Sequence, residues 1–262
     1  MSSTQQDKAQ RFRQLHQGPT FLIPNPWDAG SAQALAKIGF PALATSSGAA
    51  AMVLGRKDGQ ITRDESLAHA RRIVEAVDIP VAADMENGFG DAPAFAAETI
   101  RLAAAIGLAG GSIEDATGRP EQPLYDFGHA VERVAAAAEA ARSVGVPFTL
   151  TARTENFLRG NPDLDDTIRR LQAFAEAGAD VLFAPGLPTL DAVRAVCAAL
   201  PGKPVNFMVG IKGKSFSVPE LQAVGVRRIS LATSLYRAAM SAMQKAATEV
   251  FEQGTFGYLD RI

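Results

Sequence analysis

The amino-acid sequence predicts an α/β fold, a closed TIM-type barrel of eight parallel strands surrounded by helices. Eight short apolar runs end in Gly, Pro, Asn or Asp, and Ala-rich stretches with helical spacing separate them. Six short phrases before the strands share one form, and most of them carry a glycine that ends a helix. Alternating strands and helices give a parallel sheet, and eight such units close into a barrel.

The strands are predicted from apolar, often β-branched runs and from their spacing. Successive runs start between 21 residues (21 to 42) and 39 residues (42 to 81) apart, which is the length of one strand, one helix and two loops. The predicted strands cover residues 21–25, 42–47, 81–85, 110–115, 148–153, 181–186, 205–209 and 228–233.

The helices are predicted from apolar residues that recur every three or four positions between the strands. Asp64, Asp163 and Ser217, or a neighbour of each, are the expected N-caps, since their side chains accept hydrogen bonds from the first turn. The predicted helices cover residues 32–38, 62–77, 92–106, 125–144, 164–177, 190–200, 218–224 and 235–253.

The whole chain, residues 1–262, is expected to form one α/β-barrel domain, because no linker or change of composition divides it. Residues 1–20 form a polar, helix-prone N-terminal segment, and residues 234–262 form the last helix and a tail. The tail carries four apolar side chains between residues 254 and 262, which a monomer would have to cover. Docking on a neighbouring subunit, and hence a homo-oligomer, is the expectation.

Composition excludes several classes of function. At 262 residues and 47% hydrophobic content the chain can bury a substantial core, and its net charge of -2 comes without a basic stripe. We therefore expect neither nucleic acid nor membrane as partner, but a small molecule. An N-terminus without an apolar segment and a chain without a membrane-length run indicate a cytoplasmic protein. The lone Cys197 is expected to be a small core residue without redox chemistry.

Two carboxylates mark the end of the third predicted strand. Side chains alternate along a strand, so Asp84 and Glu86 are expected to point the same way while Met85 points opposite. Glu114 ends the next strand along the chain. Carboxylate ligands from several strand ends, without Cys or His, favour Mg²⁺ or Mn²⁺ over Zn²⁺.

Other polar residues follow the remaining strands, where a barrel of this type places its chemistry. An ion held by acidic residues can chelate the carboxylate and 2-oxo oxygens of a small keto acid and stabilise an enolate. Arg153 offers a planar, two-pronged donor to a carboxylate or oxyanion, and the backbone N–H groups of residues 47–49 can cradle a carboxylate. The candidates are Ser47, Gly48, Ala49, Arg153, Glu155 and Asn206 or its neighbours.

Structural interpretations of the same residues stay open. A single carboxylate at a strand end often caps a helix or pairs with an arginine, and Arg153 is then an ion-pair partner of Glu155 or Glu114. Asp58, taken alone, is a turn residue. The loop with Lys212, Lys214 and Ser215 is either a subsite for a substrate anion such as a phosphonate or an ordinary solvated loop.

Five short motifs occur in one order along the chain, and together they resemble the isocitrate lyase/phosphoenolpyruvate mutase superfamily. The resemblance extends from Pro24 to about Phe256 and is closest to the 2-methylisocitrate lyases and the phosphonomutases. The motifs are Asn25-Pro26-Trp27-Asp28-Ala29 followed by Ser46-Ser47-Gly48, then Lys57-Asp58-Gly59, the carboxylate pair before Gly88-Phe89-Gly90, Ile113-Glu114-Asp115 and Ala152-Arg153-Thr154-Glu155.

The resemblance implies roles for individual residues. Asp84 is implied as the direct ligand of Mg²⁺, and Asp58, Glu86 and Glu114 as ligands acting mainly through waters. It also implies that residues 47–49 and Arg153 bind the carboxylate and the enolate. Members of the superfamily exchange their last helix between subunits and assemble as dimers of dimers, which suits the apolar tail.

Departures from the family pattern bear on the reaction. The loop 116–123 lacks the cysteine that serves the isocitrate and methylisocitrate lyases as general acid, and Arg119 is the nearest substitute for the lysines of the phosphonopyruvate enzymes. The leading hypothesis is a Mg²⁺-dependent lyase that breaks a C–C bond of a small 2-oxo or 2-hydroxy di-acid. The alternatives are a phosphonopyruvate-type mutase or hydrolase and a catalytically silent keto-acid-binding protein. Glu155, Tyr125, a water bound by Arg119 or bulk water is the expected proton donor.

Overall fold

Eight parallel strands form a barrel that is closed except for one weak seam. The structure is a computed structural model that describes residues 3–261; Met1, Ser2 and Ile262, assigned above to the terminal segments, lie outside the described residues. The strand order is β1-β10-β9-β8-β7-β4-β3-β2, and between the two end strands the Ala44 N–H donates to Pro24 O at 3.1 Å. The predicted fold class is confirmed. The barrel strands are β1 (Phe21–Ile23), β2 (Leu43–Ala44), β3 (Val81–Asp84), β4 (Gly110–Glu114), β7 (Thr149–Arg153), β8 (Val181–Phe183), β9 (Val205–Met208) and β10 (Arg228–Ser230).

Helices surround the barrel and bury their apolar faces against the outward-facing side chains of the strands, such as Met85 and Ile113. Gly39 and Gly178 end two of them with φ of 105° and 110°, a left-handed backbone that favours glycine. The helices between the strands are α2 (Ala29–Ile38), α4 (Arg63–Ala76), α5 (Pro93–Ala105), α6 (Phe127–Ser143), α7 (Leu164–Glu176), α8 (Leu190–Ala198) and α9 (Val218–Ala223).

Local hydrogen bonding sets the ends of two elements differently from the prediction. The strand predicted over 42–47 ends at Ala44, because Ser46 caps a short helix, α3 (Ser47–Val53), by accepting from the Ala49 N–H at 3.5 Å. Thr62 rather than Asp64 caps α4, and Asp64 lies in its first turn, where a negative charge suits the helix dipole.

The stretch between β4 and α6, predicted as a loop, contains an antiparallel hairpin of β5 (Ala116–Arg119) and β6 (Gln122–Leu124). Its outer end is tied to the neighbouring loop, where Arg119 Nη1 donates to Asp91 Oδ1 at 2.9 Å and to Oδ2 at 2.8 Å. The hairpin was not predicted because its residues are small, polar or charged and show no apolar alternation.

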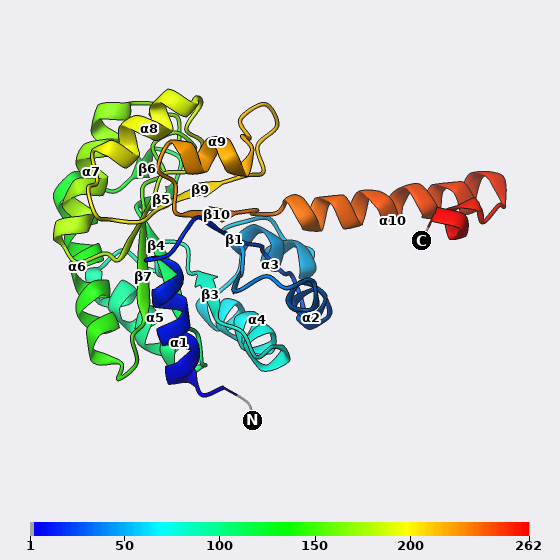
Figure 1. Cartoon of the computed structure of the whole chain (residues 1–262), viewed down its shortest axis with the longest axis horizontal. Coiled ribbons are helices and arrows are strands. Elements are labelled where there is room, and N and C mark those ends of the chain that lie inside the picture. The colour runs from blue at the N-terminus through cyan, green and yellow to red at the C-terminus, as the bar shows by residue number, and fades with distance from the viewer. Residues whose placement is uncertain (1–2, 262) are drawn as a thin grey trace.

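Helix α10 (Ser234–Gln253) extends away from the barrel (Figure 1) and is followed by the short 3-10 helix η1 (Gly257–Arg261). None of its residues is buried, and Met243 and Phe251 are 53% and 91% exposed. Exchange of this helix between subunits and the single-domain assignment both stay predictions. Within residues 3–261, no helix combines the length and apolar character that crossing a bilayer requires.

Helix α1 (Gln5–Leu15) packs on the amino-terminal ends of the strands through Phe12, and His16 follows it into the base of the barrel. The His16 Nδ1 lies 2.8 Å from Phe12 O, and the His16 Nε2 lies 3.3 Å from Arg228 Nη1. Burial, with the charge of Arg228 as the second cause, lowers the pKa of His16 to about 3. The imidazole is therefore neutral in the folded protein at any ordinary pH.

This buried histidine predicts a loss of stability in acid. Its pKa is lower folded than unfolded, so its contribution is complete above pH 6.5 and is lost as the pH falls toward 3. When the pH falls from 7.5 to 5.0, we expect the effect of His16 to lower the free energy of unfolding by about 2 kcal/mol. The variant His16→Gln should lack this part of the pH dependence. Urea denaturation at both pH values measures it, with His129→Gln as the control on a partly exposed histidine. An unchanged pH dependence in His16→Gln would contradict the assignment.

Candidate active site

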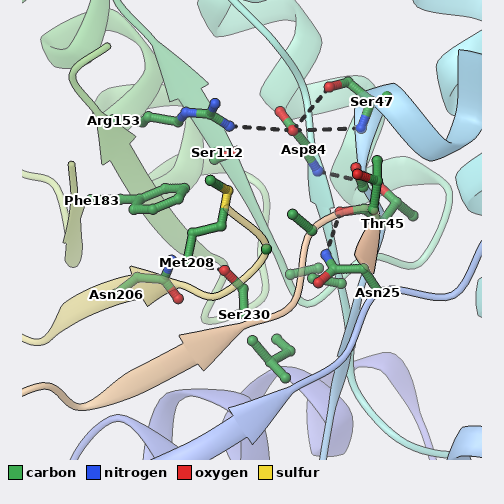
Figure 2. A pocket seen from close by; sticks show the side chains of 18 of the residues that line it. Asn25, Thr45, Ser47, Asp84, Ser112, Arg153, Phe183, Asn206, Met208 and Ser230 are labelled. Carbon is green, nitrogen blue, oxygen red and sulfur yellow. Dashed lines mark hydrogen bonds and ion pairs between the residues drawn. The ribbon is translucent and has the colours of Figure 1, made fainter. Parts of the chain in front are cut away.

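A cavity of about 320 Å³ opens at the carboxyl ends of the barrel strands (Figure 2). Its wall includes Ser47, Asp58, Asp84, Arg153 and Asn206, five of the residues predicted to form the site. Parallel strands bring these residues, far apart in the chain, to one end of the barrel.

Asp84 is the last residue of β3, and its carboxylate lies at the centre of this group. Its Oδ2 accepts from Ser47 Oγ at 3.1 Å and lies 3.4 Å from Arg153 Nη1, while its own N–H donates to Thr45 Oγ1 at 3.2 Å. Met85, next along the chain, points outward and is fully buried in the core. The alternation predicted for this strand therefore holds for Asp84 and Met85.

Glu86 follows the strand instead of continuing it. Its φ of 47° is a left-handed conformation, and its N–H donates to Asp84 Oδ1 at 3.1 Å. Its side chain lines a second cavity of about 670 Å³, with Glu114 and Arg159. Ser47, Asp58 and Arg153 line both cavities, so the two spaces share one wall.

The carboxylates of this region crowd one another. Burial first, then the charges of Asp84 and Asp58, raise the pKa of Glu86 to about 7, and its buried Oε1 has no hydrogen-bond partner. Asp58 is exposed as a residue, but its carboxylate is partly desolvated. This desolvation and the charge of Asp84 raise the pKa of Asp58. Burial raises the pKa of Glu114 well above its ordinary value. Excess negative charge of this kind suits a bound cation.

The donor set fits a hard divalent cation that keeps part of its water. Oxygen atoms dominate, and no cysteine or histidine is among the described residues that line either cavity. Within residues 3–261, no three Asp, Glu, His or Cys side chains converge closely enough to hold an ion alone. Mg²⁺ usually keeps several waters and is bound through one or two carboxylates, so the oxygen donors are compatible with it.

Arg153 faces three carboxylates, one of which is Asp84. Its Nε lies 2.5 Å from Glu155 Oε1 and 3.4 Å from Glu114 Oε2, and its Nη1 reaches Asp84. Its pKa is raised by these carboxylates, first by Glu155, against the opposing effect of burial. The guanidinium also stacks over Phe183, with 5.0 Å from Cζ to the ring centroid.

Glu155 lies beside the site but lines neither cavity. Its carboxylate is fully buried between Arg153 and Arg159, whose Nε is 3.2 Å from Glu155 Oε2. Arg159 also reaches Glu114 Oε1 at 3.6 Å and was missed in the sequence, although it stands four residues after Glu155. That spacing brings side chains together in a helical turn, so the pair was the available signal.

The remaining predicted residues differ in what they offer. Gly48 lines the first cavity, and a Cβ there would lie 3.1 Å from Thr233 Cγ2. Ala49 does not line the cavity, and its N–H is used by Ser46. Asn206 lines the cavity with its amide engaged, because Oδ1 accepts from Arg228 Nε at 2.8 Å and Nδ2 donates to Ser230 Oγ at 3.1 Å.

Several candidates for proton or anion chemistry do not line either cavity. Tyr125 donates to Asp91 Oδ1 at 2.7 Å, and burial raises its pKa to about 12. Arg119 is occupied by Asp91 as well. Neither they nor Lys212 and Lys214 are among the described residues that line the two cavities.

Comparison with known families identifies the family of the chain. The family model for phosphoenolpyruvate phosphomutase matches residues 12–251. The chain belongs to this family. Its members form part of the isocitrate lyase/phosphoenolpyruvate mutase superfamily of lyases and mutases, as the sequence motifs indicated. The chain is thus an enzyme of this superfamily.

Three relatives show the range of this phosphoenolpyruvate mutase family. A crystal structure from Burkholderia cenocepacia J2315, itself only provisionally assigned as a lyase or mutase, is 53% identical with a TM-score of 0.96, over 98% of this chain and 92% of that one. The 2,3-dimethylmalate lyase of Eubacterium barkeri is 30% identical over 83% of this chain and 77% of its own. The phosphoenolpyruvate phosphomutase of Streptomyces platensis subsp. rosaceus is 28% identical with a TM-score of 0.84, over 97% and 91%.

Proposed function

We propose that the protein is a Mg²⁺-dependent lyase that cleaves a C–C bond of a small 2-oxo or 2-hydroxy di-acid through a pyruvate-type enolate. The observation that carries the proposal is the meeting of Ser47, Asp84 and Arg153 in one cavity at the strand ends. An acidic cluster and an arginine facing the same space suit an anionic substrate bound beside a cation. The lyases and mutases among the relatives support this class of reaction.

Asp84 would hold the ion directly, and Asp58, Glu86 and Glu114 would act through its waters. When bound, Mg²⁺ or Mn²⁺ supplies a Lewis acid that favours negative charge on the substrate's oxygen atoms. The orphaned Oε1 of Glu86 and the crowded carboxylates support this assignment.

The chain's own residues bind and orient the substrate. The Nη1 of Arg153 faces the cavity and donates to a carboxylate or enolate oxygen, and Glu155, held by Arg159 from the other side, positions that guanidinium. The backbone at Gly48 lets the substrate approach α3 closely. Ser47 contributes its hydroxyl and N–H at the same wall.

Water is the proton donor that the surroundings support best. Glu155 is buried between two arginines, and Tyr125 and Arg119 line neither cavity and are bonded to Asp91. The open second cavity beside Glu86 and Glu114 gives water a route to the reacting atoms.

Phosphonopyruvate-type P–C chemistry is the second candidate, favoured by the family's phosphomutase members. It has less support from the side chains, because the cations proposed for a phosphonate, Arg119, Lys212 and Lys214, do not line the cavities. Incubation with phosphonopyruvate followed by ³¹P NMR separates the two: a new phosphorus signal establishes P–C chemistry, and an unchanged spectrum excludes it.

A cytoplasmic homo-oligomer, a dimer of dimers, is proposed as the form that acts. The exposed Met243 and Phe251 of α10 and Phe256 and Leu259 beyond it support burial against other subunits. Sedimentation velocity at micromolar concentration measures the assembly.

The proposed function predicts binding that needs ion and acid together. Oxalate, which resembles a pyruvate enolate, should raise Tm by about 5 °C in the presence of Mg²⁺ and by much less with either alone. Turnover of C4 to C7 di-acids, followed by product assay, should disappear in EDTA. Stabilisation without any turnover would favour a silent keto-acid-binding protein, and turnover that persists in EDTA would contradict the metal assignment.

A further inference from the structure

The interior of this barrel is hollow below the proposed site. Barrels of this kind are normally filled by bulky branched side chains. Here the cavity continues between the strands to Thr151 and Arg228, each two residues nearer its strand's start than Arg153 and Ser230. The residues that leave this space are small: Ala44, Ala82, Gly111, Ser112, Thr151 and Ser230.

At the floor of this space lies a cation without an anion. Arg228 is 7% exposed, and it forms no ion pair with an acidic residue among residues 3–261. Its partners are neutral: Asn206 Oδ1 at 2.8 Å, Thr151 Oγ1 at 3.0 Å and His16 Nε2 at 3.3 Å. Desolvation alone lowers its pKa to about 9. Buried charges in proteins are normally paired, so this one calls for a function.

The Arg228 guanidinium also has N–H donors that its three hydrogen bonds do not use. Those three hydrogen bonds use one N–H each of the five that an arginine carries, which leaves one N–H on each terminal nitrogen. Arg153, one layer above, faces three carboxylates. The two arginines of the same cavity therefore differ in their pairing, and Arg228 is the one that meets no carboxylate of the described residues.

We propose that Arg228 receives the distal carboxylate of a di-acid substrate whose other end is held at Ser47 and Arg153. The inference rests on the proposed function and narrows its substrate class. Thr151, which accepts from Arg228, is two residues from Arg153 along β7, so the two layers are about 6.6 Å apart. This separation suits a di-acid of four or five carbons with its carboxylates at opposite ends. Asn206 and Ser230, visible below Met208 in Figure 2, line the route between the ends.

Another arginine offers a competing position for the same carboxylate. Arg237 of α10 lines the cavity, but it is exposed and its Nη2 donates to Gly210 O at 2.5 Å. Solvent screens a charge in that position, so it gains less from a ligand than the buried Arg228. The variant Arg237→Met tests this alternative.

A matched pair of ligands isolates the distal carboxylate. Calorimetric titration of 2-oxoglutarate and of 2-oxopentanoate, which has the same chain without the second carboxylate, should give a preference of about 30-fold for the di-acid in the wild-type enzyme. Arg228→Met should abolish the preference and leave the affinity for 2-oxopentanoate unchanged. Arg227→Met, which removes the same charge next to it from a side chain bonded to Gly18 O, should keep the preference.

A second variant tests the Arg228 subsite if Arg228→Met folds poorly. Asn206→Asp puts a carboxylate where Asn206 Oδ1 now accepts from Arg228, so it should raise Tm and still abolish the di-acid preference. If Arg228 has only a structural role, Asn206→Asp should raise Tm and keep the di-acid preference, and the inference would then be wrong.

The titrations are repeated in EDTA, so the inference does not depend on the metal. The inference would be overturned if Arg228→Met kept the di-acid preference, or if Arg237→Met lost it instead. It would also be overturned if the wild-type enzyme bound the two acids equally or bound neither. If oxalate fails to bind with Mg²⁺ while the preference for the di-acid persists, the proposed reaction fails and the Arg228 subsite stands.

Discussion

Replacement of Asp84 by alanine is expected to lower kcat/KM by about 10³-fold or more, because this carboxylate is the point at which the proposed ion would be held. The variant should also need much more Mg²⁺ for half-maximal activity. Asp84 is the residue on which Ser47 and Arg153 converge, so no neighbour replaces it. A Mg²⁺ titration of turnover, with a di-acid that the wild-type enzyme cleaves, measures both effects.

Asp191→Ala is the matched control for this variant. Asp191 is 89% exposed at its side chain and pairs with Arg194 on the surface, so its loss should leave kcat/KM and the Mg²⁺ requirement unchanged. Full activity in Asp84→Ala, or the same Mg²⁺ requirement as wild type, would rule out the assignment.

Arg153→Met is expected to be the second severe variant, and it should affect folding as well as activity. Three carboxylates face this guanidinium, and Glu155 is fully buried. We expect a fall in kcat/KM of about 10³-fold, and a loss of about 3–5 kcal/mol in the free energy of unfolding because buried charge is left unpaired. Urea denaturation and steady-state kinetics measure the two losses.

Arg153→Lys separates charge from geometry at this position. Lysine keeps the charge but not the fork of donors, so stability should recover in part while kcat/KM stays at least about tenfold low. The control is Arg169→Lys, since Arg169 pairs with Asp166 at the surface. Wild-type kinetics in Arg153→Lys would show that a bidentate contact with the substrate is not needed.

The barrel itself was predictable because its signal is repeated eight times. Each unit contributes an apolar run, a helical stretch and a turn, so an error in one boundary leaves the count intact. The boundary errors are local: Ser47 begins a helix because Ser46 caps it, and the hairpin at 116–124 lacks apolar alternation. Asp84, Arg153, Gly48 and Asn206 reach one cavity because strand order alone brings their ends together.

Other parts of the site depend on distances that no local pattern encodes. Glu86 lines the second cavity because its backbone is left-handed. Arg159 forms ion pairs with Glu155 and Glu114. The Ala49 N–H donates to Ser46 Oγ, which caps α3. Each outcome depends on how a few residues fold after the strand ends, where periodicity carries no information.

The sequence by itself determined the class of fold, the end of the barrel at which the candidate site lies and the acidic character of that end, because periodicity and residue type are local properties. Only the tertiary structure decided which charges are compensated. Arg153 and Arg228 are both arginines on inward-facing strand positions, yet one meets three carboxylates and the other meets neutral groups. Pairing of buried charge depends on which strands are neighbours and how far each side chain reaches, and those are properties of the closed barrel.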